Sequence, residues 1–143
     1  MTPAVIDTGV LVSGVYWRHE AHQCVRAWLL GVLRLVISQA IFAEYQRVLR
    51  EVKTEQHFTT EIEPWLTTLQ KSALWVTPTP VIRPVCRDPS DDKFIEAALA
   101  ARARLLIARD ADLTDLEKPF GVEIVTPRQF LGRLPRQVRR QLE

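Results

Sequence analysis

The chain has 143 residues, of which 47% are hydrophobic and 25% are charged, values typical of one globular domain with a sizeable core rather than a disordered chain. Its 19 basic and 17 acidic side chains give a net charge of +2, and fifteen of the bases are arginine, which suits a phosphate-bearing partner. The longest apolar run, residues 27–37, contains Arg34 and falls short of the ~18 residues that a membrane span needs.

The amino-terminal residues and the two cysteines indicate a cytoplasmic protein. Residues 1–7 lack a basic flank and reach Asp7 after three apolar residues, which is unlike a signal peptide. Cys24 and Cys86 lie far apart and have no Cys-x-x-Cys spacing, so we expect reduced thiols and neither a disulfide scaffold nor a zinc site.

The first part of the chain alternates short strands with helices. Residues 5–6 lead into Asp7 as a buried strand, and apolar residues at helical spacing predict two helices within residues 10–28. A second strand is predicted over residues 33–37. Ser38 is a good N-cap for the helix that follows it, and this helix carries Glu44 near its inner face.

The middle of the chain continues the alternation. Thr60 and Glu63 form a capping box for a helix through about residue 73, in which Pro64 is tolerated because first-turn amides lack helical acceptors. A third strand is predicted over residues 75–77. The four prolines within residues 78–89 indicate an extended connection, the one candidate linker in the sequence.

The last part of the chain adds two more strands. A helix is predicted over residues 92–102, and a buried strand follows it over residues 105–108. The final strand is expected at residues 121–125. Thr126 and Pro127 then open one last helix, in the favoured order of N-cap and proline, with an apolar stripe that continues to Leu142.

This alternation predicts a single α/β domain over residues 1–143. Its mostly parallel central sheet is expected to carry helices on both faces, which gives a three-layer α/β/α arrangement. In sheets of this kind, ligands bind at the carboxyl ends of the strands. We therefore expect the functional site at that edge of the sheet.

Four carboxylates are predicted to meet at this edge. Asp7 ends the first strand, Asp110 follows the fourth, Asp92 opens the helix before the fourth, and Glu44 lies about two turns into the helix after the second. Crowded anions raise one another's pKa, and a divalent cation relieves the repulsion. Oxygen ligands suit Mg²⁺ or Mn²⁺, which bind phosphate oxygens and activate water. The pattern therefore indicates hydrolysis of phosphodiester bonds.

Each acid also has a purely structural interpretation. Asp7 and Asp92 suit helix N-caps, Asp110 and Asp112 suit a capped turn, and Glu44 suits a solvated helix surface. Their joint occurrence at matching strand ends favours a site.

Five motifs occur in order along nearly the whole chain. They are Val5-Ile6-Asp7-Thr8, Ile37-Ser38 followed by Glu44-Tyr45 and Val48-Leu49, Cys86 to Phe94, Ala97 to Leu113, and Ile124 to Leu131. In their order and spacing the chain resembles the PIN domain family, and more narrowly the VapC-like toxin endonucleases of bacterial toxin–antitoxin pairs.

The resemblance implies an acidic quartet that holds one or two Mg²⁺ or Mn²⁺ ions and cleaves RNA. By position, the quartet is Asp7, Glu44, Asp92 and Asp110. Asp91 is the main rival of Asp92, and Asp112 is an auxiliary ligand candidate. Arg109 lies beside the predicted acids and suits a clamp on the phosphate in the transition state. The resemblance also implies a homodimer and a cognate antitoxin protein.

Two positions depart from the family pattern. Gly9 stands where the family usually has Asn, and Ala108 stands where it usually has Thr or Ser. Polar groups near metal ligands orient those ligands, so their loss favours one alternative: a catalytically degenerate PIN domain that binds RNA or a protein without cutting.

Two other enzyme classes fit less well. The run Asp7-Thr8-Gly9 matches the aspartic protease signature, which requires a second copy and an all-β fold. A haloacid-dehalogenase-like phosphatase requires a second Asp at the position of Gly9.

Overall fold

The computed structural model describes residues 1–78, 80 and 85–143. Within these residues, the strands form one five-stranded sheet in the order β3-β2-β1-β4-β5, and every neighbouring pair is parallel. The strands are β1 (Thr2–Ile6), β2 (Leu33–Ile37), β3 (Leu74–Trp75), β4 (Leu105–Ile107) and β5 (Glu123–Val125). The predicted parallel α/β sheet is confirmed.

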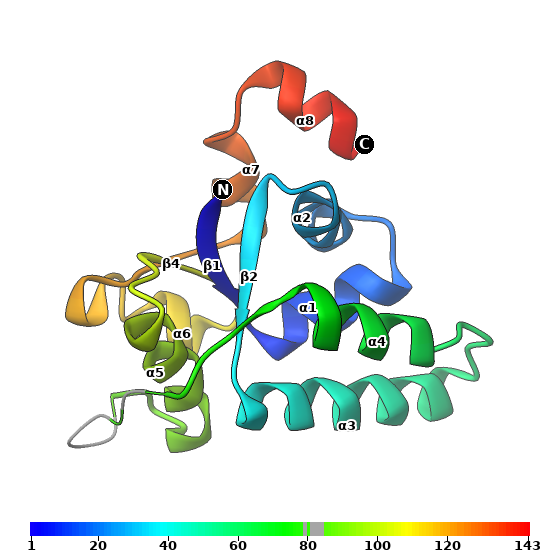
Figure 1. Ribbon diagram of the computed structural model, residues 1–143, viewed down its shortest axis with the longest axis horizontal. Coiled ribbons are helices and arrows are strands. Elements are labelled where there is room, and N and C mark those ends of the chain that lie inside the picture. Colours follow the sequence, from blue (N-terminus) through cyan, green and yellow to red (C-terminus); the bar gives the residue numbers. More distant parts are fainter. Residues whose placement is uncertain (79, 81–84) are drawn as a thin grey trace.

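Helices connect the strands and cover both faces of the sheet. They are α1 (Thr8–Tyr16), α2 (Glu20–Leu29), α3 (Gln39–Gln56), α4 (Glu63–Ser72), α5 (Asp92–Ala100), α6 (Ala111–Thr114), α7 (Pro127–Gly132) and α8 (Arg136–Leu142), with 3-10 turns at Pro89–Asp91 and Pro119–Gly121. In Figure 1, α1 and α2 lie on one side of β1 and β2, and α5 lies on the other. The three-layer arrangement is therefore also confirmed. Among the described residues, we find no helix with the length and apolar character to cross a membrane.

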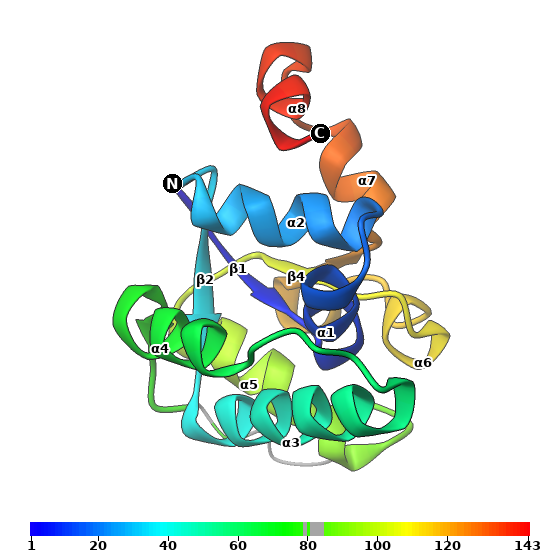
Figure 2. The same cartoon turned by 90° about the vertical axis from the view of Figure 1, so that its right-hand side faces the viewer.

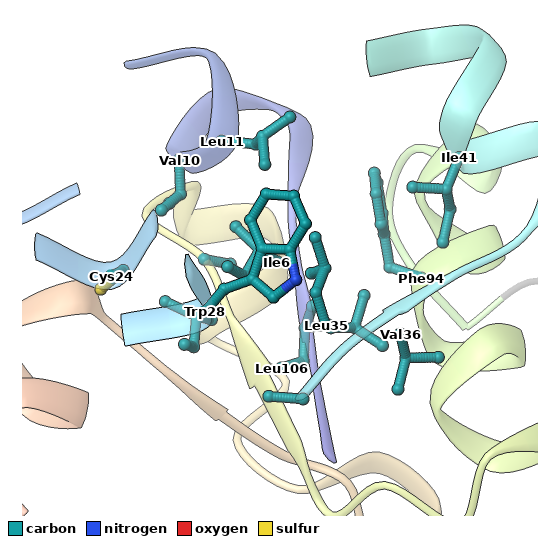
Figure 3. Packing of buried hydrophobic residues seen from close by; sticks show 14 of the residues in the cluster. Ile6, Val10, Leu11, Cys24, Trp28, Leu35, Val36, Ile41, Phe94 and Leu106 are labelled. Atoms are coloured by element: carbon teal, nitrogen blue, oxygen red, sulfur yellow. The ribbon is translucent and has the colours of Figure 1, made fainter. Parts of the chain in front are cut away.

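The core is built around β1, the central strand. Ala4, Val5 and Ile6 have no exposed surface, because β1 has a neighbour on each side and helices over each face. Figure 3 shows the Trp28 indole of α2 packed near Ile6 on one side of the sheet. On the other side, the ring of Phe94 from α5 lies beside Ile41 of α3. Both faces of the sheet thus contribute to one hydrophobic core.

Gly14 sets how closely α1 and α2 approach each other. A Cβ atom built on Gly14 would lie 2.5 Å from Cγ2 of Val25 and 2.6 Å from the carbonyl oxygen of Ala21. Both distances are shorter than ordinary van der Waals contact, so the close packing of the two helices requires glycine here.

The predicted capping box at Thr60 is wrong. Helix α4 begins at Glu63, and its N-cap residue is Ile62, which makes no side-chain capping bond. The physical reason is Pro64, whose nitrogen carries no hydrogen. A helix capped by Thr60 would place this proline at its fourth position, where the first helical hydrogen bond needs an N–H donor. Beginning at Glu63 places the proline in the first turn, where no such donor is needed.

Several other elements end earlier or begin later than predicted. β3 ends at Trp75, α5 ends at Ala100, and β4 ends at Ile107. The last strand begins at Glu123, because Gly121 adopts a positive φ of 82° in the preceding 3-10 turn. Of the predicted connection over residues 78–89, positions 79 and 81–84 lie outside the described residues.

The predicted last helix is two helices. α7 ends at Gly132, and Pro135 is the N-cap of the separate helix α8, because a proline cannot continue a helix from within. The predicted N-cap at Thr126 is confirmed, and Gln129 completes a capping box with it. Both Figure 1 and Figure 2 place α8 at the end of the molecule opposite α3.

Candidate active site

Asp7 lies where the central strand ends. Its backbone N–H donates to the carbonyl of Ile107 at 2.9 Å, so the end of β1 is tied to the end of β4. The Asp7 side chain is the N-cap of α1, accepts the Val10 N–H at 2.9 Å, and the residue is only 6% exposed. The strand order thus places a buried carboxylate between β2 and β4, at the carboxyl edge of the sheet.

Glu44 reaches the same edge from α3, which crosses below the ends of β1 and β2 in Figure 1. The Thr8 hydroxyl donates to one carboxylate oxygen of Glu44, and the Lys93 ammonium lies 2.7 Å from the other. The fully buried Tyr45 hydroxyl donates to the carbonyl of Ile6 and holds α3 against the end of β1. The position of Glu44 is therefore set by contacts with two other elements.

Asp110 lies three residues after the end of β4, whereas Asp7 follows β1 directly. It is the N-cap of the short helix α6 and accepts the Asp112 N–H at 2.9 Å. Asp110 is exposed, in contrast to Asp7. The capping role that a solitary aspartate would suggest is thus present, and the carboxylate also faces the pocket described next.

A pocket of about 360 Å³ lies at these strand ends. Asp7, Glu44, Asp91 and Asp110 all line it, together with Thr8, Gly9 and Arg109. Three of the four predicted quartet residues are therefore brought together. The predicted position of Arg109 beside these acids agrees with the structure.

Asp92, the fourth predicted residue, does not line the pocket. Its carboxylate is buried on another side, where it accepts the backbone N–H of Cys86 at 2.8 Å and that of Val85 at 3.1 Å. Asp91, at the end of the 3-10 turn, provides the fourth carboxylate of the pocket. The two acids are consecutive in the sequence at the start of α5. The 3-10 turn, of which Asp91 is the last residue, sets which of the two carboxylates lies toward the strand ends.

Burial and mutual repulsion make the free pocket unfavourable for negative charge. Burial is the largest cause that raises the pKa of Asp7 from 3.8 to about 7, and Asp91 and Asp110 add to the effect. Burial also raises the pKa of Asp91 to about 6, with contributions from Asp88, Asp110 and Glu44. Oxygen donors whose charges are poorly compensated are the ligands that a hard divalent cation prefers. The donor set therefore fits Mg²⁺ or Mn²⁺.

The carboxylates are not yet gathered in coordination geometry. Within the described ranges, no three Asp, Glu, His or Cys side chains are grouped closely enough to hold a metal ion. In this arrangement the Asp7 carboxylate accepts the Val10 N–H, and the Glu44 carboxylate pairs with Lys93. A bound cation would have to draw the carboxylates of Asp7, Asp91 and Asp110 closer together.

Asp112 lies beside the pocket rather than in its lining. Its carboxylate pairs with the Arg87 guanidinium at 3.0 Å, which joins α6 to the segment before the 3-10 turn. The role of Asp112 as an auxiliary ligand stays a prediction.

The two departures from the expected pattern have different surroundings. Among the described residues, and apart from the backbone of its own helix, a Cβ atom on Gly9 would meet the Asp7 carboxylate oxygen alone, at 3.9 Å, so this position has room for a side chain. Ala108 is fully buried, and its N–H donates to the carbonyl of Val125 at 2.9 Å. A polar group is thus missing next to Asp7 in a position where it would fit.

Comparison with protein families decides the classification. The profile of the PIN domain matches residues 3–112, a range that includes every acid of the pocket. The chain belongs to the PIN domain family. PIN domains are commonly nucleases, and they typically use divalent metal ions. A search of curated proteins found no match to this PIN domain.

Proposed function

We propose that this PIN domain is a Mg²⁺- or Mn²⁺-dependent endoribonuclease. The observation that carries the proposal is the pocket at the ends of β1 and β4, which is lined by four acidic residues. The raised pKa of Asp7 supports it, because burying that carboxylate away from water destabilises the metal-free fold. Structural roles such as helix capping do not require four acids from four separate segments of the chain to line one pocket.

In this proposal, Asp7, Asp91 and Asp110 hold the divalent ion, and Glu44, whose oxygens are engaged by Thr8 and Lys93, completes the site through water. When bound, the ion provides Lewis acidity toward a phosphate oxygen and a water molecule. The Arg109 guanidinium, which lines the pocket, binds a phosphate oxygen and offsets the charge that develops during cleavage.

Asp92 has a different role in the proposal. By accepting the N–H groups of Val85 and Cys86, it holds the segment before the 3-10 turn. This segment leads directly into the turn that carries Asp91, so Asp92 positions that acid without itself facing the pocket.

The substrate is proposed to be RNA, on the basis of the resemblance to VapC-like toxins. The charge balance is compatible with a polyanionic substrate. When the four pocket acids are left out of the count, 19 basic side chains remain against 13 acidic ones. The same resemblance leads us to propose a cognate antitoxin as a protein partner, a homodimer as the assembly, and the cytoplasm as the place of action.

One observation favours a second candidate, a PIN domain that binds RNA or a protein without cutting. Gly9 leaves space beside Asp7 where a polar side chain would fit, and Ala108 is equally without a polar group. Losing such groups weakens metal binding or activity by about 10- to 100-fold in other metal sites.

Cleavage of a mixed fluorescent RNA pool separates the two candidates. The purified protein is assayed with Mg²⁺, Mn²⁺ or EDTA, beside Asp91→Asn and Asp110→Asn proteins. We expect cleavage with either metal and its loss with EDTA or with either substitution. RNA binding without cleavage, together with no Mn²⁺ binding in calorimetry, would overturn the nuclease proposal and support the PIN domain that binds RNA without cutting.

A further inference from the structure

A lysine is held against the acidic pocket. The Lys93 ammonium lies 2.7 Å from a carboxylate oxygen of Glu44 and donates to the carbonyl oxygen of Ser90 at 2.7 Å. It also lies 5.5 Å from the centre of the ring of Phe94, and Phe94 is only 1% exposed. These three contacts restrict the ammonium, and only 19% of the Lys93 side chain is exposed.

Both oxygens of Glu44 are already engaged. The Thr8 hydroxyl donates to one, and Lys93 pairs with the other. Two-metal sites place their ions about 4 Å apart, and each ion needs its own oxygen ligands. The acid that a second ion would need is therefore bound to a cation that the chain itself provides.

The charges of the pocket also favour a single divalent ion. Four carboxylates line it, and among the described residues Arg109 in the lining and Lys93 on Glu44 provide the positive charges. When all four acids are ionised, this leaves two negative charges. One divalent ion balances them, whereas two ions would leave an excess of positive charge.

We propose that Lys93 is the second cation of this pocket, so that the pocket binds one divalent ion and the Lys93 ammonium takes the place of another on Glu44. The inference rests on the proposed metal site and adds its stoichiometry. It also gives Lys93 a positioning role, because the lysine keeps Glu44 in place through the same ion pair. A fixed ammonium supplies positive charge beside the phosphate without depending on metal concentration.

Calorimetric titration of the full chain with Mn²⁺ tests this inference. The wild type and Lys93→Arg, which keeps the charge, should each bind one ion. Lys93→Met should bind a second ion, or bind its single ion at least about tenfold more tightly. The exposed Lys71 on α4 provides a matched control, because Lys71→Met changes the net charge equally and should leave the titration unchanged.

The outcomes distinguish the two proposals. Two ions in the wild type, or no gain of binding in Lys93→Met, would overturn the role of Lys93 while the nuclease proposal stands. Binding by Lys93→Met alone would overturn the one-ion pocket of the wild type and, with it, the metal site proposed for the natural protein. No Mn²⁺ binding by any variant would overturn both. Thermal unfolding confirms that each variant is folded, and Lys93→Gln replaces Lys93→Met if the latter is not.

Discussion

Asp91 and Asp92 are adjacent in the chain, yet their carboxylates face different parts of the molecule. Asp91 lines the pocket at the strand ends, whereas Asp92 is 5% exposed and accepts two backbone N–H groups from residues 85 and 86. The same chemical change at the two positions therefore has two different expected effects.

We expect Asp91→Asn to remove Mn²⁺ binding and RNA cleavage while the free energy of unfolding stays the same or rises. Asp92→Asn should instead lower the free energy of unfolding by about 1–3 kcal/mol, because a buried acceptor of two N–H groups becomes an amide with one acceptor atom. Urea unfolding and Mn²⁺ calorimetry on both variants measure the two effects. Loss of stability in Asp91→Asn with unchanged Mn²⁺ binding would exchange the roles of the two acids.

The stability of the metal-free protein should fall as pH rises from about 4 to 7. Asp7 has an ordinary pKa of 3.8 and a folded-state pKa of about 7, so in this window the unfolded chain has lost a proton that the folded chain retains. The folded state is then disfavoured with increasing pH, by up to about 4 kcal/mol from this residue alone. Asp91, whose pKa is raised to about 6, contributes in the same direction.

Asp7→Asn provides the control for this pH effect, because Asn does not titrate and is an equally good N-cap for α1. Thermal unfolding in EDTA should show a smaller loss between pH 5 and pH 8 for the variant than for the wild type. Equal slopes for the two proteins would mean that Asp7 is not the group responsible. Added Mn²⁺ should raise the stability of the wild type at pH 8 and leave Asp7→Asn nearly unchanged.

Gly14→Ala should destabilise the protein by about 1–3 kcal/mol, because the new methyl group has no space between α1 and α2. Gly132→Ala in α7 is the matched control, since a Cβ atom there has no neighbour within 4 Å in the described part of the chain outside its own helix backbone. Urea unfolding of both variants measures the difference. A Gly14→Ala protein as stable as Gly132→Ala would show that the two helices approach less closely than described.

Gly9→Asn should strengthen Mn²⁺ binding by about tenfold, because the amide would lie next to the Asp7 carboxylate in space that is free in the wild type. Gly9→Ala separates this effect from helix propensity, as it stabilises α1 without adding a polar group. Calorimetric titration of both variants with Mn²⁺ measures the difference in affinity. If the two bind Mn²⁺ equally well, the missing amide is not what limits the site.

Much of the fold follows from local patterns. β2 has the predicted bounds, Ser38 caps α3 as expected, and the carboxyl edge of the sheet could be located because strands and helices alternate regularly. The capping box at Thr60 failed because it would place Pro64 at the first position that must donate a helical N–H, and not in the part of the first turn where a proline is tolerated. The separate α8 was missed because the apolar stripe continues past Pro135 although the backbone does not.

The site was predictable where a residue lies just beyond the end of a strand. Asp7 follows β1 directly and Asp110 lies three residues after β4 ends, while Glu44 has a weaker signal through its distance from Ser38. The choice between Asp91 and Asp92 depends on the rotation of one turn, which their order does not reveal. The contact of Lys93 with Glu44 joins α5 to α3, and no spacing rule connects two charged residues that far apart.

The position of β4 beside β1 has a consequence for the protein during its synthesis. A ribosome releases β1 and the adjoining Asp7 before β4, the neighbouring strand that leads to Asp110 and follows about a hundred residues later. A growing chain can therefore pair β1 with β2 and bury part of its core while the acids remain separated. If the proposed activity holds, the nascent chain is harmless to the messenger RNA that encodes it until the fourth strand has emerged.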